Sequence, residues 1–331
     1  MIAPSSPAVP AGLVLRPYAG ESDIPAIVGV INAEWEHDRV PGRVAVEEKA
    51  AQYRHASESF DARRDLTLAE VDGEVIGYGI RGWTDVADSD VREYRCDGSV
   101  VPAWRGRGIG RALLGENMRL ARQMAAGHET ARGRAFGSMS HEHQDADEAL
   151  LRSEGFEQVR FFCDMVRTDL DDVPEVPLPE GLTVRPATAA DGRALWEADH
   201  EAFRDHWGGY DDSEESFSRF ADGPEFDPGL WVVAWDGERI AGAVINAIYP
   251  KENEALGVKR GWLDSVFTLR PYRRRGLARA LIARALVVLR DRGMTGAILD
   301  VDSDNGTGAL GLYESAGFRV AHRSSSWRKP M

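Results

Sequence analysis

The stretch "RPYRRRGLARAL", from Arg270 to Leu281, places a cationic, glycine-containing turn directly before an apolar helix. The helical spacing of apolar residues continues to Gly293, which is a typical helix stop. The first amide groups of a helix have no partner inside the helix, and the positive end of the helix dipole lies behind them. Gly276 has no Cβ, so the backbone can approach an anion closely there. The turn therefore predicts an anion site, and a phosphate is the ligand that such sites commonly bind.

A second turn of the same kind, "VPAWRGRGIGRALL", runs from Val101 to Leu114. Three more landmarks recur: the "LRP" and "VRP" strand ends, the Asp-Gly hairpin signals in "EVDGEV" and "AWDGER", and the endings "SEGF" and "SAGF". Each pair is separated by about 165 residues. The chain of 331 residues therefore contains two copies of one domain.

The repeats set the expected domain boundaries. We expect a flexible leader at 1–12, a first domain at 13–168, an acidic, proline-rich linker at 169–181 and a second domain at 182–331. Each copy orders its elements as strand, helices, hairpin, strand, cationic turn, helix, strand, helix and strand. This order is typical of an α/β (α+β) fold around a mixed sheet.

Composition excludes several classes of protein. The sequence has no apolar run long enough to span a membrane, and its start lacks the basic and apolar regions of a signal peptide. With only two cysteines, Cys96 and Cys163, a cytoplasmic location is expected. A formal net charge of −14 argues against a nucleic-acid partner and favours a cationic small molecule. We expect no metal site, because the spacing in "SHEH" does not suit zinc.

The pattern Arg-x-x-Gly-x-Gly/Ala in both turns resembles the coenzyme A diphosphate loop of the GNAT acyltransferase superfamily. The downstream stretch "LDVDSDNGTGALGLYESAGF", from Leu299 to Phe318, resembles the next motif of that superfamily. The resemblance implies two tandem GNAT-like domains that use acetyl-coenzyme A. It implies coenzyme contacts at Val266, Phe267, Thr268, Arg273, Arg274, Arg275, Gly276, Leu277, Ala278, Arg279 and Asn305 in the second copy, and at Val100, Arg105, Gly106, Arg107, Gly108, Gly110 and Arg111 in the first.

The two copies differ at one position that matters for chemistry. When the Gly-Phe endings are superimposed, Tyr313 of the second copy corresponds to Leu151 of the first. In the superfamily this tyrosine commonly lies near the coenzyme sulfur and can protonate the departing thiolate, whereas leucine has no proton to donate. The resemblance therefore implies a catalytic second copy, with Tyr313 as its acid, and a degenerate first copy that is structural, regulatory or binds coenzyme without turnover.

Acyl transfer to an amine also requires loss of a proton from the amine. Asp264, on the strand that enters the second turn, is the candidate base, and strand alternation places it on the face of Trp262, Val266 and Thr268. A sheet-edge or interface carboxylate is the alternative. By the resemblance, the segment from His200 to Asp212 lines the acceptor pocket. The candidate acceptor-binding residues are Phe203, His206, Trp207 and Tyr210.

These observations predict an N-acetyltransferase that moves an acetyl group from acetyl-coenzyme A to a primary amine of a small molecule. We expect a monomer or homodimer without nucleic-acid or membrane partners. Two alternatives remain open at this point: an antibiotic-modifying acetyltransferase, and a non-catalytic acyl-coenzyme A sensor or scaffold. Thiol release in the presence of a panel of amines distinguishes an enzyme from a sensor.

Overall fold

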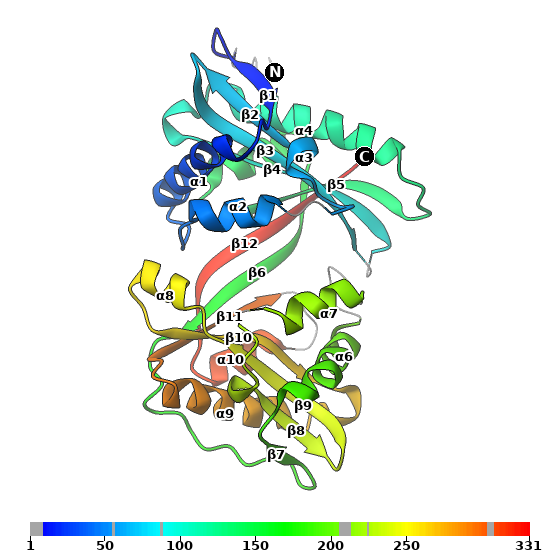
Figure 1. The fold of residues 1–331 in the computed structure, drawn as a ribbon, viewed down its shortest axis with the longest axis vertical. Helices are drawn as coiled ribbons and strands as arrows, with labels where there is room; N and C mark the ends of the chain where they lie inside the picture. The colour runs from blue at the N-terminus through cyan, green and yellow to red at the C-terminus, as the bar shows by residue number, and fades with distance from the viewer. Residues whose placement is uncertain (1–8, 55–56, 87–88, 205–212, 224, 303–307) are drawn as a thin grey trace, which may run out of the picture. The chain divides into compact units, whose positions relative to one another are not determined.

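The computed structural model describes residues 9–54, 57–86, 89–204, 213–223, 225–302 and 308–331 (Figure 1). Contacts divide the chain into two compact units. Unit 1 comprises Met1–Phe161 and Ser324–Met331, and unit 2 comprises Phe162–Arg323. Among the described residues, no helix combines the length and the apolar character needed to cross a membrane.

Unit 1 is a mixed sheet with helices on both faces (Figure 1). Its strands follow the order β1-β2-β3-β4-β5-β12, and only β4 and β5 are parallel. Helix α1 packs on the face that carries Leu66 and Leu68, whereas α4 packs against Ile76 and Val100. The elements of the first sequence repeat are β1 (Val14–Pro17), α1 (Ile24–Asp38), α2 (Val46–Arg54), α3 (Ala62–Asp65), β2 (Leu66–Val71), β3 (Glu74–Val86), β4 (Val91–Val100), α4 (Ile109–Ala126), β5 (Gly133–His141), α5 (Asp145–Ser153) and β6 (Glu157–Arg167).

Unit 2 repeats this design, with the strand order β6-β11-β10-β9-β8-β7. Helix α9 packs so closely on β10 that a Cβ at Gly261 would lie 2.3 Å from Leu289 Cδ2. The elements of the second sequence repeat are β7 (Thr183–Arg185), α6 (Gly192–Phe203), α7 (Glu214–Ala221), β8 (Val232–Asp236), β9 (Arg239–Ala247), α8 (Pro250–Leu256), β10 (Arg260–Thr268), α9 (Leu277–Asp291), β11 (Gly296–Asp302), α10 (Ala309–Ser315) and β12 (Arg319–Pro330). The prediction of an α/β fold around a mixed sheet is confirmed.

The turn chemistry read from the sequence also matches the structure. Asp72 and Gly73 both adopt positive φ angles, 50° and 84°, in the two-residue turn between β2 and β3. Such angles suit a tight hairpin, and Gly tolerates them without steric cost. The corresponding hairpin joins β8 and β9. Helix α9 ends at Asp291, and Gly293 follows it with a φ of 84°.

Each unit contains an end strand that belongs by sequence to the other copy. Residues 324–330 of β12 pair with β5 in unit 1, from Ser324 opposite His141 to Pro330 opposite Ala135. Residues 162–167 of β6 pair with β11 in unit 2. The compact units therefore differ from the sequence repeats at these two strands, because the final strand of each repeat completes the sheet of the other unit.

Candidate active site

The two cationic turns have the same backbone conformation. Gly276 caps α9 with a φ of 83°, and Gly108 caps α4 with a φ of 76°. Two residues earlier, Arg274 and Gly106 also have positive φ angles, 59° and 71°. No described side chain caps either helix, and a Cβ at Gly276 or Gly106 would have no described atom within 4 Å. Both turns thus leave the first helical amides open to an anion, as a coenzyme diphosphate requires.

The turn arginines of unit 2 donate to neutral oxygens. Arg273 donates from Nε to the Thr268 carbonyl at 2.9 Å and from a terminal nitrogen to the Ala202 carbonyl at 3.1 Å. Arg275 donates to the Glu180 carbonyl, and Arg279 donates to the hydroxyl of Ser315. These contacts orient the guanidinium groups without cancelling their charge. Within the described residues, none of the three arginines contacts a carboxylate, so this turn presents net positive charge.

Unit 1 neutralises the equivalent arginines. Arg105, the counterpart of Arg273, donates to both oxygens of Asp38 at 2.8 and 2.6 Å and to Glu34 at 2.9 Å. Arg111, the counterpart of Arg279, pairs with Glu154. Arg107 differs, because its guanidinium lies over the Trp104 ring. Two of the three arginines in this turn therefore already have carboxylate partners.

Three acidic side chains surround Arg105. Oxygen atoms of Glu34, Asp38 and Asp147 lie within 4.8 Å of one another. Burial, together with the charge of Asp147, raises the pKa of Glu34 to about 7. Because the Arg105 guanidinium binds Glu34 and Asp38, it already serves as the cation of this group.

In unit 2, β10 and β11 move apart along the path expected for the pantetheine arm. Parallel pairing of β10 with β11 ends at Trp262 and Ile298. Beyond that point, no described residue of β11 pairs with β10 at Val266, Phe267 or Thr268. The side chains of Phe267 and Leu277 are buried in the core, so their expected coenzyme contacts can involve only backbone groups. Ala278 and Arg279 lie in the first turn of α9.

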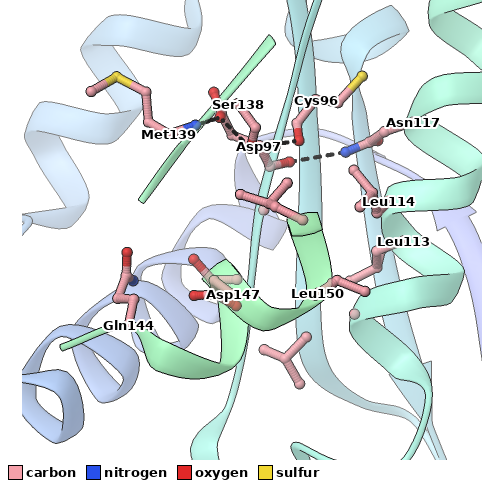
Figure 2. A pocket seen from close by; sticks show the side chains of 15 residues that line it. Cys96, Asp97, Leu113, Leu114, Asn117, Ser138, Met139, Gln144, Asp147 and Leu150 are labelled. Atoms are coloured by element: carbon pink, nitrogen blue, oxygen red, sulfur yellow. Dashed lines mark hydrogen bonds between the residues drawn. The ribbon is translucent and has the colours of Figure 1, made fainter. Parts of the chain in front are cut away.

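Figure 2 shows a pocket at the corresponding strand separation in unit 1, between β4 and β5. Asp97 lies at the start of the separation, and its carboxylate accepts hydrogen bonds from Ser138 Oγ at 3.2 Å and Met139 N at 3.0 Å. Its carbonyl accepts one from Asn117 at 2.9 Å. The wall includes Val100, Gly110, Leu150 and Leu151. Asp97 thus bridges β4 and β5 at the point where a coenzyme arm would pair with the backbone.

Tyr313 lies on α10 and is 8% exposed. The Phe318 amide donates to its carbonyl at 3.1 Å, as the Phe156 amide donates to the Leu151 carbonyl at 3.0 Å in unit 1. These matching contacts support the equivalence of Tyr313 and Leu151. Burial, followed by the charge of Asp300, raises the pKa of Tyr313 to about 12. The phenol therefore stays protonated near neutral pH.

Asp264 occupies an irregular position in β10. The register with β9 shifts between Leu263 and Ser265, so the regular alternation expected from Trp262 to Thr268 is interrupted at Asp264. The bulge leaves Asp264 accepting a hydrogen bond from Tyr249 Oη at 2.8 Å. Burial is the main cause of the raised pKa of Asp264, and this hydrogen bond opposes it.

The expected acceptor pocket is described only in part. Phe203 is the last residue of α6 and packs against the core of unit 2. His206, Trp207, Tyr210 and Asn305 lie outside the described residues. Sequence reasoning missed Asp300 on β11, which lies directly opposite Asp164 of β6. The sequence pattern could have identified Asp300, because Asp300 and Asp302 alternate with buried apolar residues along β11.

Comparison with known proteins agrees with this geometry. Residues 193–318 match the acetyltransferase (GNAT) family, and residues 62–158 match an acetyltransferase (GNAT) domain. A mycothiol acetyltransferase of Geodermatophilus obscurus is 30% identical over 92% of this chain and 94% of its own length. Another, from Thermomonospora curvata, is 32% identical over 92% and 93%. A GCN5-related N-acetyltransferase from Sphaerobacter thermophilus, solved by crystallography, has a TM-score of 0.77 at 27% identity and covers 98% of this chain and 97% of that one.

Proposed function

The chain belongs to the GNAT acetyltransferase family, and from this premise we propose that unit 2 carries the catalytic site. In this proposal, unit 2 transfers an acetyl group from acetyl-coenzyme A to a primary amine of a small molecule. The observation that carries it is the difference between Arg273 and Arg105. Arg273 donates to carbonyl oxygens, whereas Arg105 is bound by two carboxylates.

A coenzyme diphosphate fits the turn of unit 2 in charge and in space. The open amides at the start of α9 supply donors, and Arg273, Arg275 and Arg279 supply charge that no described carboxylate neutralises. Helix-end contacts of this kind stabilise an anion by about 0.3–1 kcal/mol each, and more where they are partly buried. In unit 1, the same anion would have to compete with Glu34, Asp38 and Glu154 for two of the arginines.

Acetyl-coenzyme A would supply the thioester, whose C–S bond breaks as the amine nitrogen forms a C–N bond with the acetyl carbon. We assign the amine proton to Asp264, directly or through water, because Asp264 borders the separation of β10 and β11. We assign protonation of the departing sulfur to Tyr313, whose phenol remains protonated in its buried position. The backbone at Val266 to Thr268, which pairs with no described residue of β11, would bind the pantetheine arm and polarise the acetyl carbonyl.

The test is steady-state thiol release from acetyl-coenzyme A with a panel of small primary amines. The relatives' name, mycothiol acetyltransferase, makes a mycothiol-type acceptor the first to try. We expect amine-dependent thiol release that unit 2 variants abolish and equivalent unit 1 variants retain. Coenzyme binding without any amine-dependent thiol release would contradict the proposal.

A further inference from the structure

A β-bulge distinguishes β10 of unit 2 from β4 of unit 1. Over their described residues, β3 and β4 pair in a register without a shift. In unit 2, the register of β9 with β10 shifts between Leu263 and Ser265, which leaves Asp264 as an extra residue on β10. Bulges re-aim a side chain, and they are frequent next to active sites. The direction of the candidate base Asp264 therefore depends on this bulge.

A carboxylate of α6 binds the residue that follows the bulge. Ser265 donates from Oγ to Oδ1 of Asp199, which lies on α6 and is 9% exposed. On the other side of the bulge, Tyr249 donates from Oη to the Asp264 carboxylate at 2.8 Å, and Tyr249 directly precedes α8. Side chains thus tie the bulge to two helices, to α6 through Ser265 and to the start of α8 through Asp264.

The first copy builds the same helix position without a carboxylate. Asp199 is the eighth residue of α6, and the eighth residue of α1 is Ile31. Ile31 is 3% exposed and belongs to the core of unit 1. An apolar side chain is therefore sufficient for the packing of this helix on its sheet. Because a buried carboxylate costs free energy relative to such a side chain, stability does not explain Asp199.

The strand residue that binds Asp199 also differs between the copies. Ser265 lies eight residues before Arg273, and Asp97 lies eight residues before Arg105. The Asp97 carboxylate accepts hydrogen bonds from two groups of β5 (Figure 2). The Ser265 hydroxyl donates to α6 instead. The hydrogen bond between Ser265 and Asp199 therefore belongs to the copy that has the bulge.

We propose that Asp199 is a positioning residue, which holds the bulge of β10 through Ser265 so that Asp264 is directed at the reacting amine. The inference rests on the proposed function and adds the residue that orients its base. Asp199 itself takes no proton from the substrate in this proposal. Its role is that of a hydrogen-bond acceptor fixed on a helix.

This role depends on an acceptor oxygen and not on charge. Burial raises the pKa of Asp199, whereas the hydrogen bond from Ser265 and the charge of His200 oppose that shift. A hydroxyl donates to an ionised carboxylate or to the carbonyl oxygen of a neutral amide. Asn at position 199 should therefore replace Asp, and an apolar residue should not.

Asp199→Ile tests the role, because it introduces the residue type of unit 1 and removes the acceptor. We expect kcat for amine-dependent thiol release to fall by about 10²-fold, the scale of a misplacement of about 1 Å. Coenzyme A affinity and stability to urea should not fall. Ser265→Ala removes the same contact by a smaller change and should give a similar loss, and the double variant should lose no more than either single variant. Asp199→Asn should keep most of kcat.

Glu197→Ile is the matched control, because it removes an exposed acid from the same helix. Amide hydrogen exchange of residues 263–265 in the coenzyme-free chain supplies a readout without turnover. Exchange should accelerate in Asp199→Ile and Ser265→Ala but not in Asp199→Asn or the control.

Two results would overturn the inference: unchanged exchange and kcat in Asp199→Ile, or an equal loss of kcat in Asp199→Asn. A loss of urea stability in parallel with kcat would show that Asp199 only stabilises the fold. Thiol release by wild type without the expected differences in exchange refutes this inference alone. The expected differences in exchange without amine-dependent thiol release by wild type refute the proposed function.

Discussion

Arg105 donates hydrogen bonds to both carboxylate oxygens of Asp38, at 2.8 and 2.6 Å. The pair lies at the turn of unit 1 that matches the proposed diphosphate turn of unit 2. Duplication has preserved the backbone of this turn, including the positive φ angles of Gly106 and Gly108. What differs is the charge around it, because α1 places Glu34 and Asp38 against the guanidinium.

Gly276→Glu should abolish coenzyme binding to unit 2, because it adds bulk and negative charge at the open end of α9. Gly276 has a φ of 83°, so any L-residue also introduces backbone strain. Gly276→Ala introduces the strain without the charge and serves as the control, and calorimetry measures the binding. If turnover survives Gly276→Glu but is lost in Gly108→Glu, the active site belongs to unit 1.

Tyr313→Phe should lower kcat and leave coenzyme affinity nearly intact. A general acid contributes about 10²–10⁴-fold, which sets the expected loss. The substitution keeps the ring packed against Phe318, so the folded state should persist. Single-turnover kinetics isolate the chemical step from product release, and an unchanged single-turnover rate would exclude Tyr313 as the acid.

Glu34→Gln should stabilise the protein at pH 8 but not at pH 5. The folded-state pKa of Glu34 is raised from 4.5 to about 7, so folding favours the protonated form. The stability associated with that proton is present below about pH 4.5 and is lost as pH rises through about 7, whereas Gln mimics the protonated form throughout. We expect a gain of about 1–3 kcal/mol at pH 8.

Urea unfolding at the two pH values measures this difference. Glu36→Gln, an exposed residue on the same helix, is the control. A loss of stability in Glu34→Gln at pH 8 would show that the ion pair with Arg105 outweighs the cost of burying the charge.

Trp327→Ala should destabilise unit 1, although Trp327 belongs by sequence to the second copy. Its side chain is 1% exposed in the core cluster that holds Phe136, and its indole donates to Ser140 Oγ at 2.8 Å. Truncation of such a residue costs about 3–5 kcal/mol. Hydrogen exchange should accelerate in β5 and less in β10. Faster exchange confined to β10 would contradict the strand assignment.

The salt dependence of kcat/KM tests the charge of the acceptor. If the acceptor is a cation, kcat/KM should fall as ionic strength rises, because the Debye length is about 8 Å at physiological ionic strength. A flat wild-type profile would indicate a neutral or anionic acceptor while leaving the acetyltransferase family unaffected.

Local patterns in the sequence predicted much of this architecture. The spacing of apolar residues after Gly276 predicted α9, and the Asp-Gly signals predicted both hairpins. Aligning the Gly-Phe endings of the two repeats predicted that Tyr313 and Leu151 occupy equivalent positions. These features depend on backbone conformation and side-chain periodicity over a few residues, so a single stretch of chain contains the information for each.

Tertiary structure alone decided which edges pair and which charges meet. Both copies end in a similar strand, and nothing in residues 319–330 or 157–167 states which sheet each strand completes. The carboxylate partners of Arg105 lie about 70 residues away along the chain, and Asp164 meets Asp300 across more than 130 residues. Strand pairing and Coulomb interaction depend on distance in space, so these contacts exist only once the chain has folded.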